Sequence, residues 1–219
     1  MILSKETAAL TAEKLLQIKA IKLNVSQPFT WASGLRSPIY CDNRVTLSYP
    51  ELRTYMRDQL VTAVREYFKD VDVVAGVATA GIPQGVLVAE ALGLPFIYVR
   101  SAKKTHGLTN QIEGRLESGQ SVVVVEDLVS TGKSSLAAVD ALREAGANVL
   151  GMVALFTYGL DIAAENFKQK NCKLVTLSDY DHMIEKAVAK GYVGASDKNN
   201  LAEWRKSPQV WSDNFENKK

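Results

Sequence analysis

Two adjacent carboxylates, Glu126 and Asp127, directly follow a run of four valines, and a turn rich in hydroxyl groups comes after them. When a helix begins after a strand and a turn, its first residues present free backbone N–H groups and the positive end of the helix dipole. Both features suit a phosphate. The carboxylates can accept hydrogen bonds from the hydroxyls of a sugar whose phosphate occupies the turn. The segment therefore predicts a sugar-phosphate site. Hydroxyl donors for the phosphate stand at Ser130, Thr131, Ser134 and Ser135.

Other interpretations of the same segment have to be weighed. The run Gly132-Lys133-Ser134 is similar to the end of a P-loop, but that motif requires a glycine at position 127, where Asp127 stands. A carboxylate there would repel nucleotide phosphates, so we do not expect a P-loop. A purely structural role stays open, in which Glu126 and Asp127 cap the helix or pair with Lys133.

A second polar stretch, residues 101–119, is rich in positive charge at its beginning. Arg100, Lys103, Lys104 and His106 precede its first acid, Glu113. Loops of this length inside compact domains are usually functional or disordered. Cations placed beside a leaving group that gains negative charge stabilise the transition state more than the ground state. An ordinary solvated surface is the alternative.

Strands and helices alternate from residue 71 onward. This alternation is typical of a parallel sheet, and continuous valine runs indicate that both faces of the sheet are covered. Ligands of such sheets bind beyond the carboxyl ends of the strands, where both polar segments lie. We expect strands at residues 71–77, 96–100, 121–126, 149–156 and 173–177. We expect helices at residues 7–21, 83–92, 132–145 and 161–170, one that begins at a capping box over residues 48–51, and one capped by Ser178.

Composition narrows the classes of protein. The chain has 219 residues, of which 47% are hydrophobic and 23% are charged, as in folded globular proteins. Its net charge of +2 lacks the basic excess of a dedicated nucleic-acid binder. Cys41 and Cys172 form no Cys-x-x-Cys pair, which favours reduced thiols and a cytoplasmic protein. The longest apolar run, residues 149–156, is too short to span a membrane, so we expect no membrane partner.

The segment at residues 122–135 resembles the phosphoribosyl pyrophosphate (PRPP) motif of type I phosphoribosyltransferases. Nearly the whole chain is similar to orotate phosphoribosyltransferases. The resemblance implies an α/β fold in which helices flank a parallel sheet. It also implies one domain over residues 1–219, with a small N-terminal hood, about residues 1–45 plus C-terminal elements, on a core of about residues 46–195. The segments that carry the resemblance are residues 37–44, 78–83, 98–100, 104–107 and 111–114.

The resemblance also implies a reaction. The family transfers the phosphoribosyl group of PRPP to N1 of orotate, through a transition state like an oxocarbenium ion. The products are pyrophosphate and orotidine 5′-monophosphate, which belongs to de novo pyrimidine biosynthesis. Mg²⁺ is required and is bound mainly through PRPP rather than by side chains. The proteins are homodimers in which the basic loop is mobile and closes over the neighbouring subunit's site.

Site residues follow from the resemblance by position. The turn at residues 79–81 would face pyrophosphate and its metal through backbone groups, and Ser130 would also contact orotate. The catalytic residues would be Lys104, His106 and Asp127. PRPP would be bound by Arg100, Lys104, His106, Glu126, Asp127, Leu128, Val129, Ser130, Thr131, Gly132, Lys133 and Ser134.

Some positions depart from the family pattern. Ala32, Ala80 and Thr157 stand where some members carry a lysine or an arginine. Several charged contacts are therefore missing, and Arg36 and Arg44 are the remaining candidates for holding the orotate carboxylate.

Other hypotheses stay open beside this one. A phosphoribosyltransferase for another base would share the PRPP motif, and a PRPP-binding regulator would need a DNA-binding domain or a basic face. We expect no catalytic role for Cys41, and we interpret His182 as an ordinary helix residue.

Overall fold

The computed structural model of the protein describes residues 1–31, 33–100 and 111–217. Lys104 and His106, which the resemblance assigns to PRPP binding and catalysis, lie outside the described residues, as does Ala32.

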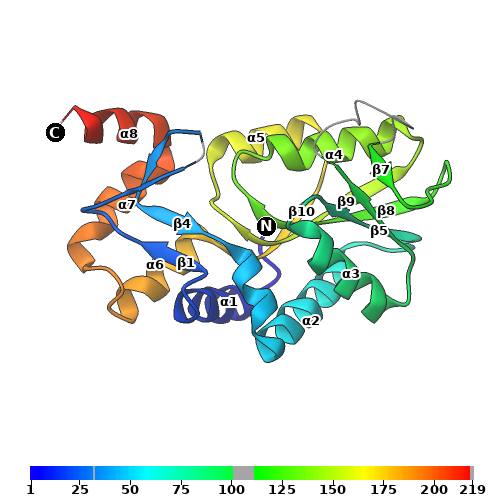
Figure 1. Ribbon diagram of the computed structural model, residues 1–219, viewed down its shortest axis with the longest axis horizontal. Coiled ribbons are helices and arrows are strands. Elements are labelled where there is room, and N and C mark those ends of the chain that lie inside the picture. The colour runs from blue at the N-terminus through cyan, green and yellow to red at the C-terminus, as the bar shows by residue number, and fades with distance from the viewer. Residues whose placement is uncertain (32, 101–110, 218–219) are drawn as a thin grey trace.

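A six-stranded sheet forms the centre of the molecule, with the strand order β10-β9-β8-β5-β6-β7 (Figure 1). Its neighbouring strands are parallel, except that β7 runs antiparallel to β6. The valines of β5 and β8 are buried, so the parallel sheet predicted from the valine runs is confirmed. The strands are β5 (Val73–Val77), β6 (Phe96–Val99), β7 (Ile112–Glu113), β8 (Ser121–Val129), β9 (Asn148–Thr157) and β10 (Leu174–Asp179).

Helices cover both faces of this sheet (Figure 1). Their apolar residues recur at helical spacing, and in α4 the predicted inner residues Leu136, Val139 and Leu142 are buried. The helices on one face are α1 (Lys5–Gln17), α2 (Pro50–Tyr67) and α3 (Gly81–Leu92), and those on the other are α4 (Lys133–Glu144) and α5 (Asp161–Gln169). A further helix, α6 (Tyr180–Ala189), packs beside α1.

Several expected helix boundaries were wrong. Helix α3 begins at Gly81 and not at Pro83. The opening helix ends at Gln17, because Ile21 already belongs to strand β1 (Ile21–Leu23). No capping box starts α2, since Ser48 ends the short helix η1 (Asn43–Ser48) and the cap residue makes no side-chain hydrogen bond. The cap of α6 is Asp179 and not Ser178, because β10 continues through Asp179 and the Ser178 hydroxyl donates to the carbonyl of Ala8.

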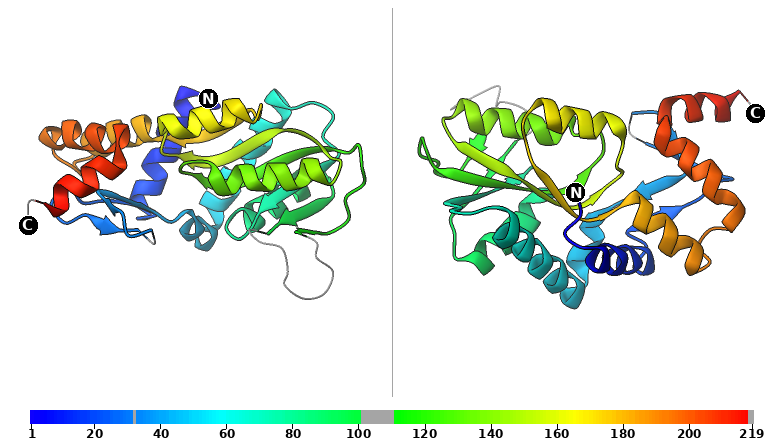
Figure 2. Two further views of the ribbon diagram at one scale, coloured as in Figure 1. Left: turned by 90° about the horizontal axis from the view of Figure 1, so that it is seen from above. Right: turned by 180° about the vertical axis from the view of Figure 1, so that it is seen from behind.

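Small hairpins and two C-terminal helices gather at one end of the molecule, and we call this group the hood. Strand β1 pairs with β4 (Ile39–Cys41), and β2 (Phe29–Thr30) pairs with β3 (Arg36–Ser37). Figures 1 and 2 show the helices α7 (Lys198–Lys206) and α8 (Pro208–Glu216) beside these strands, although most of the chain separates them in sequence.

The hood is tied together across its two parts. The Ser212 hydroxyl of α8 accepts a hydrogen bond from the backbone N–H of Arg36, and the Arg36 Nε lies 3.2 Å from a carboxylate oxygen of Glu216. Within the described residues, no helix has the length and apolarity that crossing a membrane requires.

Candidate active site

The acid pair lies inside strand β8 and not at its end as predicted, because the strand runs from Ser121 to Val129. The strand continues to Val129 because its last residues stay paired with β9, with Glu126 opposite Ala154 and Val129 opposite Thr157. Successive side chains of a strand point to opposite faces of the sheet, so the two acids lie in different surroundings. Glu126 is buried, with 5% of its surface exposed, whereas Asp127 is half-buried.

The Glu126 carboxylate is bound within the protein. One oxygen accepts the backbone N–H of Asp127 at 3.0 Å, and the other accepts the Ser135 hydroxyl at 2.9 Å. Ser135 is itself buried, so it does not offer its hydroxyl to a phosphate as the sequence had suggested. Burial and the neighbouring Asp127 charge raise the pKa of Glu126 well above its usual value, and burial also raises the pKa of Asp127. Asp127 is therefore the acid with more access to a ligand.

Replacing Glu126 with glutamine should stabilise the free protein increasingly as pH rises. A raised folded-state pKa contributes stability that is present below the unfolded pKa and is lost as pH rises through the folded pKa. Glutamine does not titrate, and its amide can still accept from Asp127 N–H and donate to the Ser135 hydroxyl. We expect the gain to be larger at pH 8 than at pH 5, because the folded-state pKa of Glu126 is raised and glutamine does not titrate.

Thermal unfolding of Glu126→Gln at pH 5, 6.5 and 8 measures this gain against the wild type. Glu144→Gln, an exposed carboxylate at the end of α4, is the matched control for loss of one negative charge. A difference between Glu126→Gln and wild type that stays constant over this range would contradict the assignment of a buried, titrating carboxyl.

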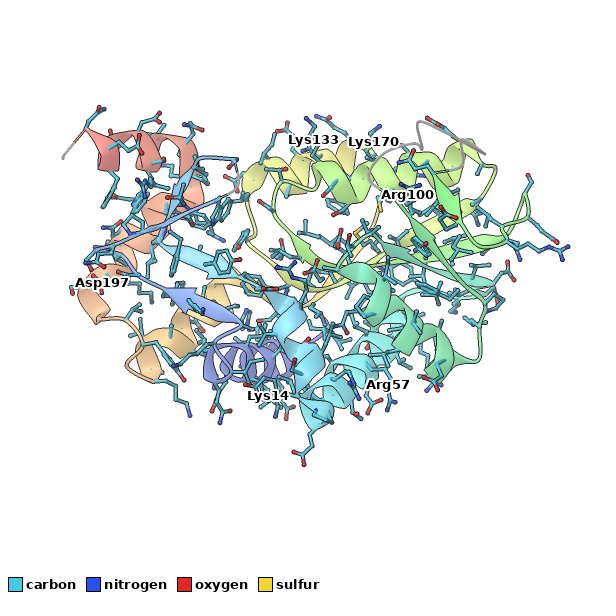
Figure 3. The ribbon with its side chains drawn as sticks, viewed as in Figure 1. Lys14, Arg57, Arg100, Lys133, Lys170 and Asp197 are labelled. Atoms are coloured by element: carbon cyan, nitrogen blue, oxygen red, sulfur yellow. The ribbon has the colours of Figure 1, made fainter. Side chains whose placement is uncertain are left out.

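The turn after β8 is shaped for a bound anion. Its glycine, Gly132, has a φ of 77°, and a Cβ there would lie 2.7 Å from the Phe167 ring. Helix α4 begins at Lys133, so its first N–H groups face the turn without partners in the helix. Neighbouring elements hold the turn in place, because the Asn166 amide of α5 donates to the carbonyl of Thr131 at 3.0 Å. Thr131, Lys133 and Ser134 are exposed around it, and Figure 3 shows Lys133 at the start of α4.

The turn before α3 packs directly against the acid pair. A Cβ on Gly81 would lie 2.6 Å from the Val125 carbonyl oxygen and 3.5 Å from a carboxylate oxygen of Glu126. Only glycine allows this approach. The backbone at residues 79–81, expected to face pyrophosphate, is therefore next to the carboxylates.

Arg100 follows β6 at the same edge of the sheet (Figure 3). Its Nη1 lies 3.6 Å from a carboxylate oxygen of Glu113. Within the described residues this buried nitrogen has no hydrogen-bond partner, so the guanidinium keeps donor capacity for an anion.

A buried polar network, which sequence reasoning missed, connects the hood to the acid pair. The fully buried Asn43 donates from Nδ2 to the Asp127 carbonyl at 2.6 Å and accepts the Cys41 thiol at its Oδ1. Its own carbonyl accepts the Thr46 hydroxyl, which in turn accepts a hydrogen bond from Gln84 of α3. Asn43 lies within the segment at residues 37–44 that carried the resemblance, but only the fold brings it to Asp127.

A cavity of about 220 Å³ lies between the hood and the carboxyl ends of β8 and β9. Its walls are largely aromatic and apolar, which suits a small planar ligand. Trp31 and Tyr158 stack with their ring centroids 5.3 Å apart. The lining residues are Trp31, Tyr40, Cys41, Leu128, Ser130 and Tyr158. We call this cavity the base pocket.

The Cys41 thiol and the two candidate arginines near the base pocket are each bound to another residue in this structure. Burial and the Asp127 charge raise the pKa of the Cys41 thiol well above its usual value, which fits the expectation that it is not a nucleophile. Neither arginine proposed for the orotate carboxylate lines the pocket. Arg36 pairs with Glu216 of α8, and Arg44 makes two hydrogen bonds to the carboxylate of Asp42 at 2.7 and 3.0 Å.

Two further side chains named from the sequence have local roles. The Thr157 hydroxyl donates to the Val129 carbonyl and accepts the backbone N–H of Gly159, which secures the end of β9. His182 lies in α6 with its Nδ1 2.7 Å from Asp179, as an ordinary helix residue would. In the part of the chain that the structure describes, no three His, Cys, Asp or Glu side chains are grouped to hold a metal ion.

Comparison with known proteins agrees with this geometry. The model of the phosphoribosyl transferase domain matches residues 54–189. The orotate phosphoribosyltransferase of Porphyromonas gingivalis is 54% identical over 94% of this chain and 99% of its own length. That of Listeria innocua is 56% identical over 91% of this chain and 96% of its own. The solved orotate phosphoribosyltransferase of Aeropyrum pernix is 31% identical with a TM-score of 0.73, covering 84% of this chain and 99% of that one.

Proposed function

The chain belongs to the orotate phosphoribosyltransferases, a family with the phosphoribosyl transferase domain, and from this premise we infer that it transfers a phosphoribosyl group from PRPP to orotate. The products are orotidine 5′-monophosphate and pyrophosphate, so the enzyme is a transferase of pyrimidine biosynthesis.

One structural observation supports this inference independently of family membership. The short segment from Asp127 to Ser134 contributes to three neighbouring features: a half-buried carboxylate, a phosphate-binding turn and one wall of the base pocket. Leu128 and Ser130 line the pocket, and the turn begins directly after them. A ribose whose 5′-phosphate occupies the turn therefore has its hydroxyls near Asp127 and its C1 toward the pocket.

The reaction then follows from these positions. The bond between C1 and a pyrophosphate oxygen breaks, and its electron pair leaves with pyrophosphate. N1 of orotate releases its proton to solvent and forms the new bond to C1. Asp127 accepts hydrogen bonds from the ribose hydroxyls, and its negative charge favours the positive charge that develops on the ring. Glu126 keeps Asp127 in place through the backbone N–H that it accepts. Arg100, whose Nη1 lies 3.6 Å from Glu113 and makes no hydrogen bond among the described residues, is placed to donate to the departing pyrophosphate.

Magnesium is part of the proposal as an ion that enters with PRPP. Mg²⁺ usually keeps several waters and binds substrate phosphates with at most one or two carboxylates. A site in which Asp127 is half-buried and the Glu126 carboxylate is bound within the protein fits that pattern better than a cage made by the protein alone. When bound, the ion neutralises charge on the diphosphate.

Assembly and location are further parts of the proposal. The enzyme acts as a homodimer in which the basic loop, including Lys104 and His106, serves the neighbouring subunit's site. It works in the cytoplasm, which the free thiols of Cys41 and Cys172 favour.

The assay that tests the function follows orotate by its ultraviolet absorbance. Purified protein should consume orotate only when PRPP and Mg²⁺ are both present, and uracil, adenine and hypoxanthine serve as control bases. Turnover of uracil and not of orotate would contradict the assignment of orotate as the substrate. It would not affect the assignment of the fold or of the PRPP site.

Replacing Asp127 with asparagine should lower turnover about tenfold or more, the scale of one lost charged hydrogen bond of about 1.5–3 kcal/mol. The fold should persist, because the side chain is half-buried and its loss removes a charge beside buried Glu126. Steady-state kinetics and thermal unfolding measure the two effects. The matched control is Asp140→Asn, because the carboxylate of Asp140 on α4 pairs with Lys170, the residue after α5. Wild-type rates with unchanged PRPP affinity would favour a merely structural acid pair.

A further inference from the structure

Two aromatic residues that line the base pocket pack against Trp204, a side chain that does not itself line the pocket. Trp204 of α7 is fully buried. Its ring contacts Trp31 of the hood edge-on, with centroids 5.7 Å apart and planes at 79°. It contacts Tyr158, at the end of β9, in the same manner at 5.6 Å and 83°. The two stacked rings that line the pocket therefore share one supporting ring behind them.

Trp204 is itself held firmly in the core. The Tyr180 ring lies 5.4 Å from it, tilted by 31°, and the Tyr180 hydroxyl donates to the carbonyl of Leu201 in α7. The opposite side of the support is also fixed, since Trp31 Nε1 donates to the carbonyl of Ile39 in β4. Through Trp204, helix α7 thus joins Trp31 of the hood hairpins to Tyr158, which follows β9, behind the base pocket.

We propose that Trp204 is a positioning residue that sets the place of Trp31 and Tyr158 and thereby the fit of the base, an inference that rests on the proposed function. Trp31 comes from the hood and Tyr158 from the core, so their relative position depends on a contact common to both. The PRPP site is built instead from residues of β8, α3 and α4. Among the described residues, the aromatic contacts of Trp204 are to Trp31, Tyr158 and Tyr180, which lie outside these three elements. Loss of Trp204 should therefore weaken binding of the base and leave binding of PRPP unchanged.

The test compares Trp204→Phe with Trp211→Phe. Trp211 belongs to the neighbouring helix α8, is 9% exposed, stacks on Phe215, and donates from Nε1 to Asn200. It makes no ring contact with either pocket residue in the described part of the chain. Both variants shorten a buried indole of the C-terminal helices, and only Trp204→Phe alters the support of the base pocket.

Steady-state kinetics with each substrate varied in turn give the decisive values. Trp204→Phe should raise the KM for orotate about tenfold, the scale expected from two weakened aromatic pairs, while the KM for PRPP stays within about twofold. Trp211→Phe should lower the melting temperature and leave both KM values unchanged. Equal changes of both KM values in Trp204→Phe, or the same pattern in the two variants, would overturn the inference.

A milder variant covers the case in which Trp204→Phe does not fold. Tyr180→Phe removes only the hydroxyl that holds α7, so it should shift the KM for orotate in the same direction by a smaller factor. An unchanged orotate KM in that variant would overturn the inference. Failure of the wild-type protein to consume orotate with PRPP and Mg²⁺ would instead refute the proposed function.

Discussion

Replacing Lys104 with alanine should lower turnover about a hundredfold, the scale observed when one donor to a transition-state charge is removed. The expectation rests on the sequence, in which four basic residues follow strand β6 before any acid. Pyrophosphate gains negative charge as it leaves, so a cation beside it stabilises the transition state more than bound PRPP. Thermal stability should hardly change, since loop side chains contribute little to a hydrophobic core.

The measurement is kcat with saturating orotate and PRPP, together with a melting curve. Lys69→Ala is the matched control, because Lys69 is an exposed lysine that follows α2 and precedes β5, at the opposite edge of the sheet from the site. A large fall in melting temperature with normal turnover would show that Lys104 is structural.

Activity should return when two inactive variants are unfolded together and refolded as mixed dimers. Lys104→Ala damages the loop, and Asp127→Asn damages the carboxylate of the phosphate-binding segment. If each loop serves the partner's site, a mixed dimer has one site with both lesions and one with neither. Equal amounts give half mixed dimers, so about a quarter of all sites, and about a quarter of wild-type activity, should be restored in closed symmetric dimers.

The opposite arrangement gives a clear result. If the loop serves its own subunit, every site carries one lesion and the mixture stays as inactive as its parents. Refolded wild type alone, and each variant refolded alone, control for losses during refolding. A protein that runs as a monomer at the assay concentration would refute shared sites before any mixing.

Local patterns in the sequence were sufficient to predict the sheet and the strand–turn–helix unit at its edge. Four consecutive valines favour a strand whose two faces are covered, and the structure buries all four. The glycine of the phosphate-binding turn could be recognised because a strand–turn–helix unit is contiguous in sequence. The structure confirms its geometry, with Gly132 in the left-handed region against Phe167.

Errors of the sequence interpretation arose where a residue's partner is distant in the chain. Glu126 and Asp127 were expected together at a strand end, but pairing with β9 extends the strand and buries Glu126 alone. Ser135 was expected to face a phosphate, yet its hydroxyl donates to Glu126 nine positions earlier. The short antiparallel strand β7 was missed because a two-residue strand has no periodicity to detect.

The sequence by itself determined the class of fold and the glycine turn between β8 and α4, because each depends on residues close together in the chain. Only the tertiary structure decided which acid is accessible and how the base pocket is walled. That pocket joins Trp31 and Tyr40 from the hood to Ser130 and Tyr158 from the core, and it is supported by Trp204. Contacts over such separations follow from the packing of whole elements, which no local pattern records.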